Sequence, residues 1–414
     1  MTMRTSARLA ALGISLAFGA AHADGLDPVW GAFGETKPIL DVRLRSEMVH
    51  QEPIAETAHA VTLRLRAGFE TGKAWNTALL IEGDAIVPIQ DDYRPDPLQP
   101  KNAIYPVVAD PEAYEINRFQ LTNTSLPGTT ITLGRQRIAL DDQRFVGPVG
   151  WRQNEQTFDA LRIVNRSVAN LVIDATYFNR ANRIYGDGSP QGDYEGDSGL
   201  INLSYQTKIG KITAYGYLLD FEDIVGVPAA VRDSTSTYGA RVAGEKPAGK
   251  IKLAYSAAYA QQTDYADNPL NFDLDYIAGE LTGTFRQFSA GVGIEVLQGN
   301  GAKGFTTPLA TLHKFNGWAD KFLATPPNGI QDLYANAGVT LKGVSKLDTL
   351  AFVASYHDYN AERTSADYGE EWDLSLAAKY KRVNLMLKFA DYRQGTLATA
   401  RDTEKVWGQV EFIW

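Results

Sequence analysis

Apolar and polar residues alternate in short segments along most of this chain. One segment places Leu40, Val42 and Leu44 on one face and Arg43 and Arg45 on the other. A period of two residues is the pattern of a β-strand, because successive side chains of a strand point to opposite faces. The repeated alternation therefore predicts an all-β protein.

The alternating segments predict about 18 strands, a number within the range of single-chain membrane barrels. We expect them at residues 37–49, 59–71, 75–86, 114–123, 129–140, 157–165, 170–179, 199–207, 211–221, 235–245, 250–262, 272–284, 286–298, 333–341, 348–358, 369–380, 383–393 and 404–414. Short and long connections alternate between them, as the periplasmic turns and external loops of such barrels do. A transmembrane antiparallel β-barrel is the predicted fold, and a secreted β-sandwich or β-propeller is the alternative.

The last strand supports the membrane interpretation. Val406, Val410 and Trp414 fall on one face, and Trp407 and Glu411 fall on the other. A barrel closes by pairing its last strand with its first, and an aromatic end suits the lipid–water interface. We therefore expect this strand to close the barrel, to contact outer-membrane lipid and to be recognised by the barrel assembly machinery.

The N-terminus has the parts of a secretory signal. Arg4 and Arg8 precede an apolar run at 9–19, and Ala21-His22-Ala23 is a small-x-small cleavage site. The apolar run is shorter than the roughly 20 residues that a helical span needs. The predicted organisation is a signal peptide at 1–23, an N-terminal periplasmic segment at 24–36 and a barrel at 37–414. The predicted location is the outer membrane of a Gram-negative cell.

Charge and cysteine content narrow the class of function. Lys and Arg number 40 and Asp and Glu number 49, so the net charge is −9. Removing the signal peptide takes away two cations and gives 38 − 49 = −11. A negative protein is a poor partner for nucleic acid. The absence of cysteine excludes a disulfide framework and thiol chemistry.

If the apolar faces meet lipid, the opposite faces line a polar lumen. Arginines gather on that face in the first six strands, and a guanidinium in the lipid would be costly. The predicted pore-lining or substrate-binding residues are Arg43, Arg45, Arg64, Arg66, Arg118, Arg135, Arg137 and Arg162. The functional interpretation is an arginine-lined constriction that recognises anions. The alternative is that neighbouring carboxylates pair with these arginines, which then only brace the wall.

One segment breaks the alternation. In residues 131–140, a strict period of two puts Arg135 and Arg137 on the lipid side. A β-bulge at Gly134 would turn both arginines inward and return Ile138 and Leu140 to the lipid. We therefore expect a bulge at Gly134.

Two long loops are candidates for narrowing the pore. The loop at 141–156 mixes charges with aromatics and is expected to fold inward, with Asp141, Asp142 and Glu155 as constriction acids. The loop at 299–332 either plugs the mouth or packs as a surface loop, the commoner case.

The sequence also resembles a known family. Leu133-Gly-Arg-Gln-Arg-Ile138, Asp141-Asp-Gln-Arg-Phe145 and the run from Trp151 to Arg162 are similar to the alginate export family of outer-membrane barrels. The resemblance implies an 18-stranded monomeric barrel with an electropositive pore for an anionic polysaccharide. Only Arg135 and Arg137 stand on its most specific motif.

The predicted function is a porin-like channel for passive diffusion of anionic polysaccharide, sugars or small organic anions. No catalytic motif occurs, and we predict no catalytic residue, no metal and no cofactor. An outer-membrane enzyme is one alternative, because a triad spread over strands leaves no local motif. A structural barrel with a closed lumen is the other.

Overall fold

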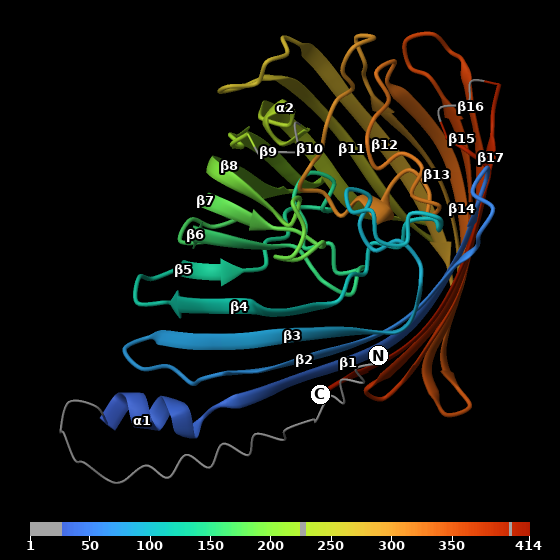
Figure 1. Ribbon diagram of the computed structural model, residues 1–414. Helices are drawn as coiled ribbons and strands as arrows, with labels where there is room; N and C mark the ends of the chain where they lie inside the picture. The colour runs from blue at the N-terminus through green and yellow to red at the C-terminus, as the bar shows by residue number, and fades with distance from the viewer. Residues whose placement is uncertain (1–26, 224–228, 397–399) are drawn as a thin grey trace, which may run out of the picture.

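The protein forms a closed barrel of 18 antiparallel strands (Figure 1). The computed structural model describes residues 27–223, 229–396 and 400–414, so the predicted signal peptide and its cleavage site lie outside the described residues. Its elements are α1 (Asp27–Gly34), β1 (Lys37–Gln51), β2 (Ala58–Glu70), β3 (Thr77–Asp92), β4 (Ala113–Asn123), β5 (Thr129–Gln136), β6 (Thr157–Asn165), β7 (Leu171–Asn182), β8 (Asp193–Thr207), β9 (Gly210–Leu219), α2 (Ala229–Arg232), β10 (Thr235–Ala248), β11 (Ile251–Asp264), β12 (Asp273–Phe285), β13 (Phe288–Leu297), the 3₁₀ turn η1 (Leu312–Lys314), β14 (Ile330–Val344), β15 (Leu347–Asn360), β16 (Asp367–Tyr380), β17 (Val383–Gln394) and β18 (Thr403–Ile413). The predicted strand number and antiparallel class are confirmed.

Each strand pairs with its neighbour in sequence, and β18 closes the ring by pairing with β1. The closing ladder runs from Asp41 opposite Ile413 to Gln51 opposite Thr403. Among the described strands, closure pairs β1 and β18 with each other, so neither is a free edge strand, as a sheet inside lipid requires. The role of the last strand as the closing strand is therefore confirmed.

The outer face is apolar and the inner face is polar, as the alternation predicted. Leu121, Leu133, Val292 and Leu387 are among many large apolar side chains exposed on the outside. Such a belt is stable only against hydrocarbon, so the barrel crosses a membrane through its strands. None of the helices in the described part of the chain is long and apolar enough to cross a membrane.

Short turns join the strands at one end, and long loops join them at the other. The turn between β4 and β5 is an example of a short connection that requires a glycine. Gly128 there has a φ of +67°, and a Cβ would lie 2.9 Å from the backbone of Ser167. Only glycine adopts this conformation without strain. Helix α1 joins the short-turn end through a hydrogen bond from the Gly72 N–H to the Ala32 carbonyl.

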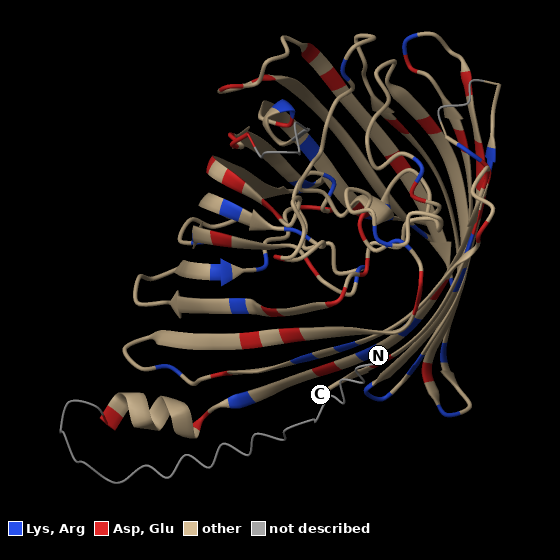
Figure 2. Ribbon diagram, in the orientation of Figure 1, with Lys and Arg blue, Asp and Glu red and all other residues tan. Residues whose placement is uncertain are grey.

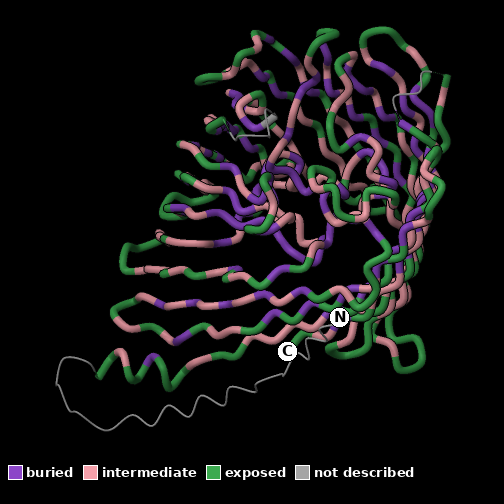
Figure 3. The backbone as a smooth tube through the Cα atoms, viewed as in Figure 1, coloured by how far each residue is buried: buried purple, intermediate pink, exposed green. Residues whose placement is uncertain are grey.

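The long loops contribute a packed core inside the barrel. Figures 1 and 3 show loop segments within the ring of strands, with many buried residues. Ile138, Val146, Phe305 and Leu309 are fully or almost fully buried there, in one cluster with wall residues such as Tyr217. The interior is thus partly filled by the chain itself.

The predicted bulge at Gly134 is wrong. The ladders from β4 to β5 and from β5 to β6 pass through Gly134 without a register shift. A register shift lies instead in the β3–β4 ladder, between Glu82 and Gly83, and leaves Asn117 as the extra residue of β4. Strand β5 ends at Gln136 rather than at 140. Ile138 and Leu140 then turn into the interior core instead of facing lipid.

Candidate functional site

The candidate site is the interior constriction made by the loops 137–156 and 298–329. In a ring of 18 strands, β10 lies opposite β1, and the loop 137–156 contacts both. At β1, Arg43 donates to the backbone carbonyls of Gly150 and Arg152. At β10, Arg241 pairs with Asp142 at 3.1 Å. The loop therefore crosses the lumen from wall to wall, and the expectation that it folds inward is confirmed.

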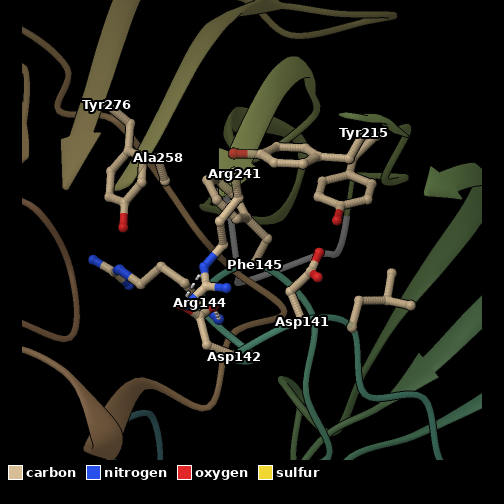
Figure 4. Close-up of a pocket in the computed structure, with 10 residues that line it drawn as sticks. Asp141, Asp142, Arg144, Phe145, Tyr215, Arg241, Ala258 and Tyr276 are labelled. Carbon is tan, nitrogen blue, oxygen red and sulfur yellow. Dashed lines mark hydrogen bonds and ion pairs between the residues drawn. The ribbon is translucent and has the colours of Figure 1, made fainter. Parts of the chain in front are cut away.

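The loop's first half is held on the side of β8 to β13. Asp141 accepts from Lys211 at 2.7 Å and from Asn202 at 2.7 Å. Figure 4 shows Arg241 and Asp142 pointing toward each other beside Tyr215 and Tyr276. The space left among these side chains holds about one water molecule, so it is not a solute site. Asp141 and Asp142 fix the loop to this wall.

Arg144 anchors the two loops to each other. Its guanidinium pairs with Glu295 of β13 at 2.7 Å and donates to Thr307 and Asn316 of the second loop. Burial, the largest single cause, lowers the pKa of the Arg144 guanidinium, but the charge and hydrogen bond of Glu295 together with Tyr276 and Asp142 outweigh burial and raise that pKa. The side chain stays charged and paired.

The loop's last part joins a charged network on the wall of β2 to β4, which we call the wall network. It contains Arg66, Glu82, Asp84, Asn117, Arg118, Arg137 and Glu155. Arg66 makes a two-pronged contact with Asp84, at 2.6 Å for both bonds, and Arg118 makes another with Glu82. Three arginines face three carboxylates, so the network is formally neutral. Glu155, a predicted constriction acid, contacts Arg66, Arg137 and Asn117 within it.

A second group of contacts, which we call the loop anchor, joins both loops to β1, β17 and β18. It consists of Trp151, Arg152, His313, Asp320, Glu47, Lys388 and Lys405. Arg152 bridges Glu47 at 3.0 Å and Asp320 at 3.1 Å. The loop 298–329 thus plugs part of the lumen, and the interpretation as a surface loop is wrong.

His313 is held neutral in the loop anchor. Its Nδ1 lies 2.7 Å from Asp320 and its Nε2 lies 2.8 Å from the Lys388 ammonium. A lysine has no acceptor, so Lys388 donates and Nε2 accepts, which leaves the proton on Nδ1. Burial, above all, lowers the pKa of His313 well below its ordinary value of 6.5. Burial raises the pKa of Asp320, but His313 and Lys405 outweigh it and hold that pKa well below 3.8.

Aromatic rings complete the loop anchor. Trp151 stacks on His313 with ring centroids 4.1 Å apart, and the Arg45 guanidinium lies 4.2 Å from the Trp151 ring centroid. Lys388 lies 3.6 Å from the Trp318 ring centroid. A cation over an aromatic face is attracted by the ring quadrupole, and more strongly away from water. This side of the lumen is filled by side chains.

The predicted arginines separate into three groups. Arg43, Arg45, Arg64 and Arg66 face inward but are buried; for example, the Arg45 and Arg64 side chains are each 1% exposed. Arg118, Arg137 and Arg162 face inward and keep 15%, 32% and 21% of their side chains exposed. Arg135 alone contradicts the prediction of an inward position. Arg135 pairs across the strands with Phe119 and Asp159, and this row of side chains lies on the outer face. No bulge in β5 turns the Arg135 side chain to the inner face.

Several residues of the site were missed by the sequence interpretation. Arg144 and Arg152 lie in a loop that was singled out, but nothing in the sequence showed their partners, which lie more than 100 residues away. His313, Asp320 and Lys388 gave no local signal. Lys211, whose side chain is 42% exposed beside Asp141, lies on the polar side of its strand.

Comparisons with known proteins show the fold. Among solved structures of Pseudomonas aeruginosa proteins, OccK5 (OpdH) matches with a TM-score of 0.65 and 12% identity, covering 92% of this chain and 99% of that one. OccK2 (OpdF) in complex with glucuronate matches with a TM-score of 0.66 and 12% identity, covering 92% and 98%. The outer membrane protein opdK matches with a TM-score of 0.66 and 14% identity, covering 91% and 98%.

No protein-family model and no curated protein matches the chain, so the resemblance to the alginate export family is not confirmed. The structural likeness spans almost the whole barrel at low identity. The chain therefore has the closed 18-stranded barrel fold of these Pseudomonas proteins.

Proposed function

We propose that the protein is a passive channel of the outer membrane for small organic anions. The observation that carries the proposal is the uneven exposure of the lumen cations. On the side of β4 to β9, Arg118, Arg137, Arg162 and Lys211 keep part of their charge accessible. On the side of β16 to β2, the cations are buried beneath the two loops.

The solute path proposed here runs past the accessible cations. Arg137 is the central residue, because the inward loop carries it and its side chain is the most exposed of the lumen arginines named above. A guanidinium offers a planar fork that matches a carboxylate. Glu82 and Glu155 already contact it, so an entering carboxylate competes with them for its donors. Such competition favours weak, transient binding, which a channel needs for release.

Small anions fit this arrangement better than a long polyanion. Every accessible cation of the proposed path has a carboxylate partner within 4 Å, namely Glu82, Glu155, Asp174 or Asp141. A polysaccharide with regularly repeated carboxylates would meet these acids at every step. The neighbour solved with glucuronate, a single sugar acid, is consistent with a small solute.

The test is ion selectivity in planar bilayers. The purified protein is expected to form discrete channels whose reversal potential, in a gradient of potassium glucuronate, reports anion preference. Arg137→Gln with Lys211→Gln should lower the anion-to-cation permeability ratio about fivefold for each of the two charges removed, since one charge at about 4 Å in water is worth about 1 kcal/mol. Lys250→Gln, an exposed residue of a short turn, is the matched control and should leave the ratio unchanged.

Two outcomes would contradict the proposed channel function or its path. A barrel that inserts but does not conduct would support a closed structural barrel instead. Conduction with unchanged selectivity in the double variant would remove Arg137 and Lys211 from the path.

A further inference from the structure

The short-turn end of the barrel carries a regular series of cations. Each of the five two-residue turns β8–β9, β10–β11, β12–β13, β14–β15 and β16–β17 has at least one exposed Lys or Arg (Figure 2). These residues are Lys208, Lys250, Arg286, Lys346, Lys381 and Arg382. The series places positive charge at one rim of the barrel, outside the lumen network.

Some of these cations sit on exposed aromatic rings. Arg382 lies 3.9 Å from the Trp414 ring centroid, Arg286 lies 5.2 Å from Phe285, and Lys381 lies 5.3 Å from Tyr380. Exposed aromatics near the ends of membrane strands lie at the lipid–water interface. The stacked cations therefore lie at the level of the lipid headgroups.

The opposite rim carries carboxylates beside its outer tyrosines. On its outer face, Tyr259 donates to Asp275 and Tyr356 donates to Glu370, so tyrosines there are paired with carboxylates. A carboxylate repels a phosphate, whereas a guanidinium or ammonium binds one. Asp348 at the short-turn rim accepts from the backbone N–H of Lys381 at 2.7 Å, but every two-residue turn of that rim adds at least one cation, so this rim is favoured for an anionic headgroup.

Charge and aromatic rings converge most closely where the β16–β17 turn meets the end of the closing strand β18, a place that we call the seam. Lys381 and Arg382 are adjacent in one turn, and both are exposed. The Ile413 N–H donates to the Arg382 carbonyl at 3.0 Å, and the Trp414 N–H donates to the Leu40 carbonyl at 2.8 Å. These bonds hold the Trp414 ring beside the turn, although the ring itself is exposed.

We propose that Lys381, Arg382, Tyr380 and Trp414 form a binding site for the phosphate headgroup of an anionic phospholipid. The leaflet is the one that the short turns face. Arg382 would offer a two-pronged contact to the phosphate and Lys381 a second charge. The rings would lie against the glycerol and upper acyl region. A lipid is favoured over a cell-wall polymer because the cations rest on rings of the membrane interface.

The experiment is native mass spectrometry of the whole protein in detergent, with phosphatidylglycerol and phosphatidylcholine added in equal amounts. The wild type is expected to retain phosphatidylglycerol preferentially. Lys381→Gln with Arg382→Gln should reduce that preference by on the order of fivefold for each cation removed. Arg166→Gln with Lys208→Gln removes the same charge from two other turns and should keep most of the preference.

Equal loss in both double variants would overturn the site in favour of a general charge effect. Retention of phosphatidylglycerol by Lys381→Gln with Arg382→Gln would also overturn it. Two further measurements use inorganic phosphate as a competitor of the lipid and test whether the protein sediments with isolated cell-wall sacculi. Inorganic phosphate should compete only weakly with phosphatidylglycerol for the site. If sedimentation with sacculi depended on Lys381 and Arg382 while no lipid preference was seen, the ligand of the site would be the cell wall and not a lipid. Conductance should be unchanged in the seam variant, which separates this proposal from the channel function.

Discussion

The two sides of the lumen use the same kinds of side chain for different purposes. On the side of β16 to β2, cations are buried against loops, aromatic rings and more than one acid, as Arg152 is between Glu47 and Asp320. On the side of β4 to β9, cations stay partly exposed beside their acids, as Arg162 does beside Asp174 of the neighbouring strand. Burial, rather than residue type, separates a structural cation from a candidate for solute contact.

The largest expected effect on stability comes from removing a buried cation on the side of β16 to β2. Arg152→Met removes a buried cation and leaves Glu47 without an ionic partner within the loop anchor. Breaking a buried pair from one side costs about 3–5 kcal/mol. We expect a lower midpoint of urea unfolding in detergent and a larger single-channel conductance, because the loops lose their anchor.

The matched control for that change is Arg162→Met on the open side. Its partner Asp174 is reached by water, so the loss should be about 0–1 kcal/mol. A similar loss of stability in both variants would show that the two sides do not differ in the way that their burial indicates.

The sequence predicted the wall much better than the anchor. Register alone places Arg66 near Asp84 and Arg162 near Asp174, since both pairs lie on neighbouring strands with a period of two. Arg144 and Glu295 are 151 residues apart and meet only because the loop crosses the lumen. No local pattern encodes such a meeting.

The error at Gly134 has a local cause. Strict alternation put two arginines on the lipid side of the strand, so an irregularity of the strand was needed to turn them inward. Glycine is the residue that often marks such a bulge. The chain instead ends β5 at Gln136 and turns Arg137 inward within the loop. Arg135 stays in its strand and is satisfied by Asp159 and by the carbonyl of Ile116, next to the β4 irregularity. Strand ends were the least predictable feature.

An intermediate effect on the anchoring of the loops is expected from a change of pH, because His313 can take up a proton. In the anchored loop His313 is neutral and its pKa lies well below 6.5, whereas a released loop would restore the ordinary value. As pH falls below about 6.5, the released state therefore binds a proton that the anchored state does not. Anchoring should weaken by up to about 1.4 kcal/mol per pH unit. Asp320 opposes release until the pH falls below its ordinary value of 3.8.

The measurement is single-channel conductance between pH 7.5 and 5. The wild type should show more open time, or larger steps, toward pH 5. His313→Gln keeps a donor and an acceptor but does not titrate, so its conductance should change less over the same range. An identical pH response in both proteins would assign the response to another group.

The smallest perturbation is chemical modification of the arginines in the native barrel. A dicarbonyl reagent added at low dose, followed by peptide mass mapping, reports which guanidinium groups are accessible without changing any of them beforehand. Among the inward arginines, Arg137 should react first, then Arg162 and Arg118, whereas Arg45 and Arg64 should stay unmodified. Arg393, which is exposed at the long-loop end, serves as the reference for full access. Glucuronate should slow modification of Arg137 but not of Arg393, because only the former lies on the proposed path. Early modification of Arg45 or Arg64 would instead show that the filled side opens in solution, and the solute path would then have to be drawn along the β1 wall.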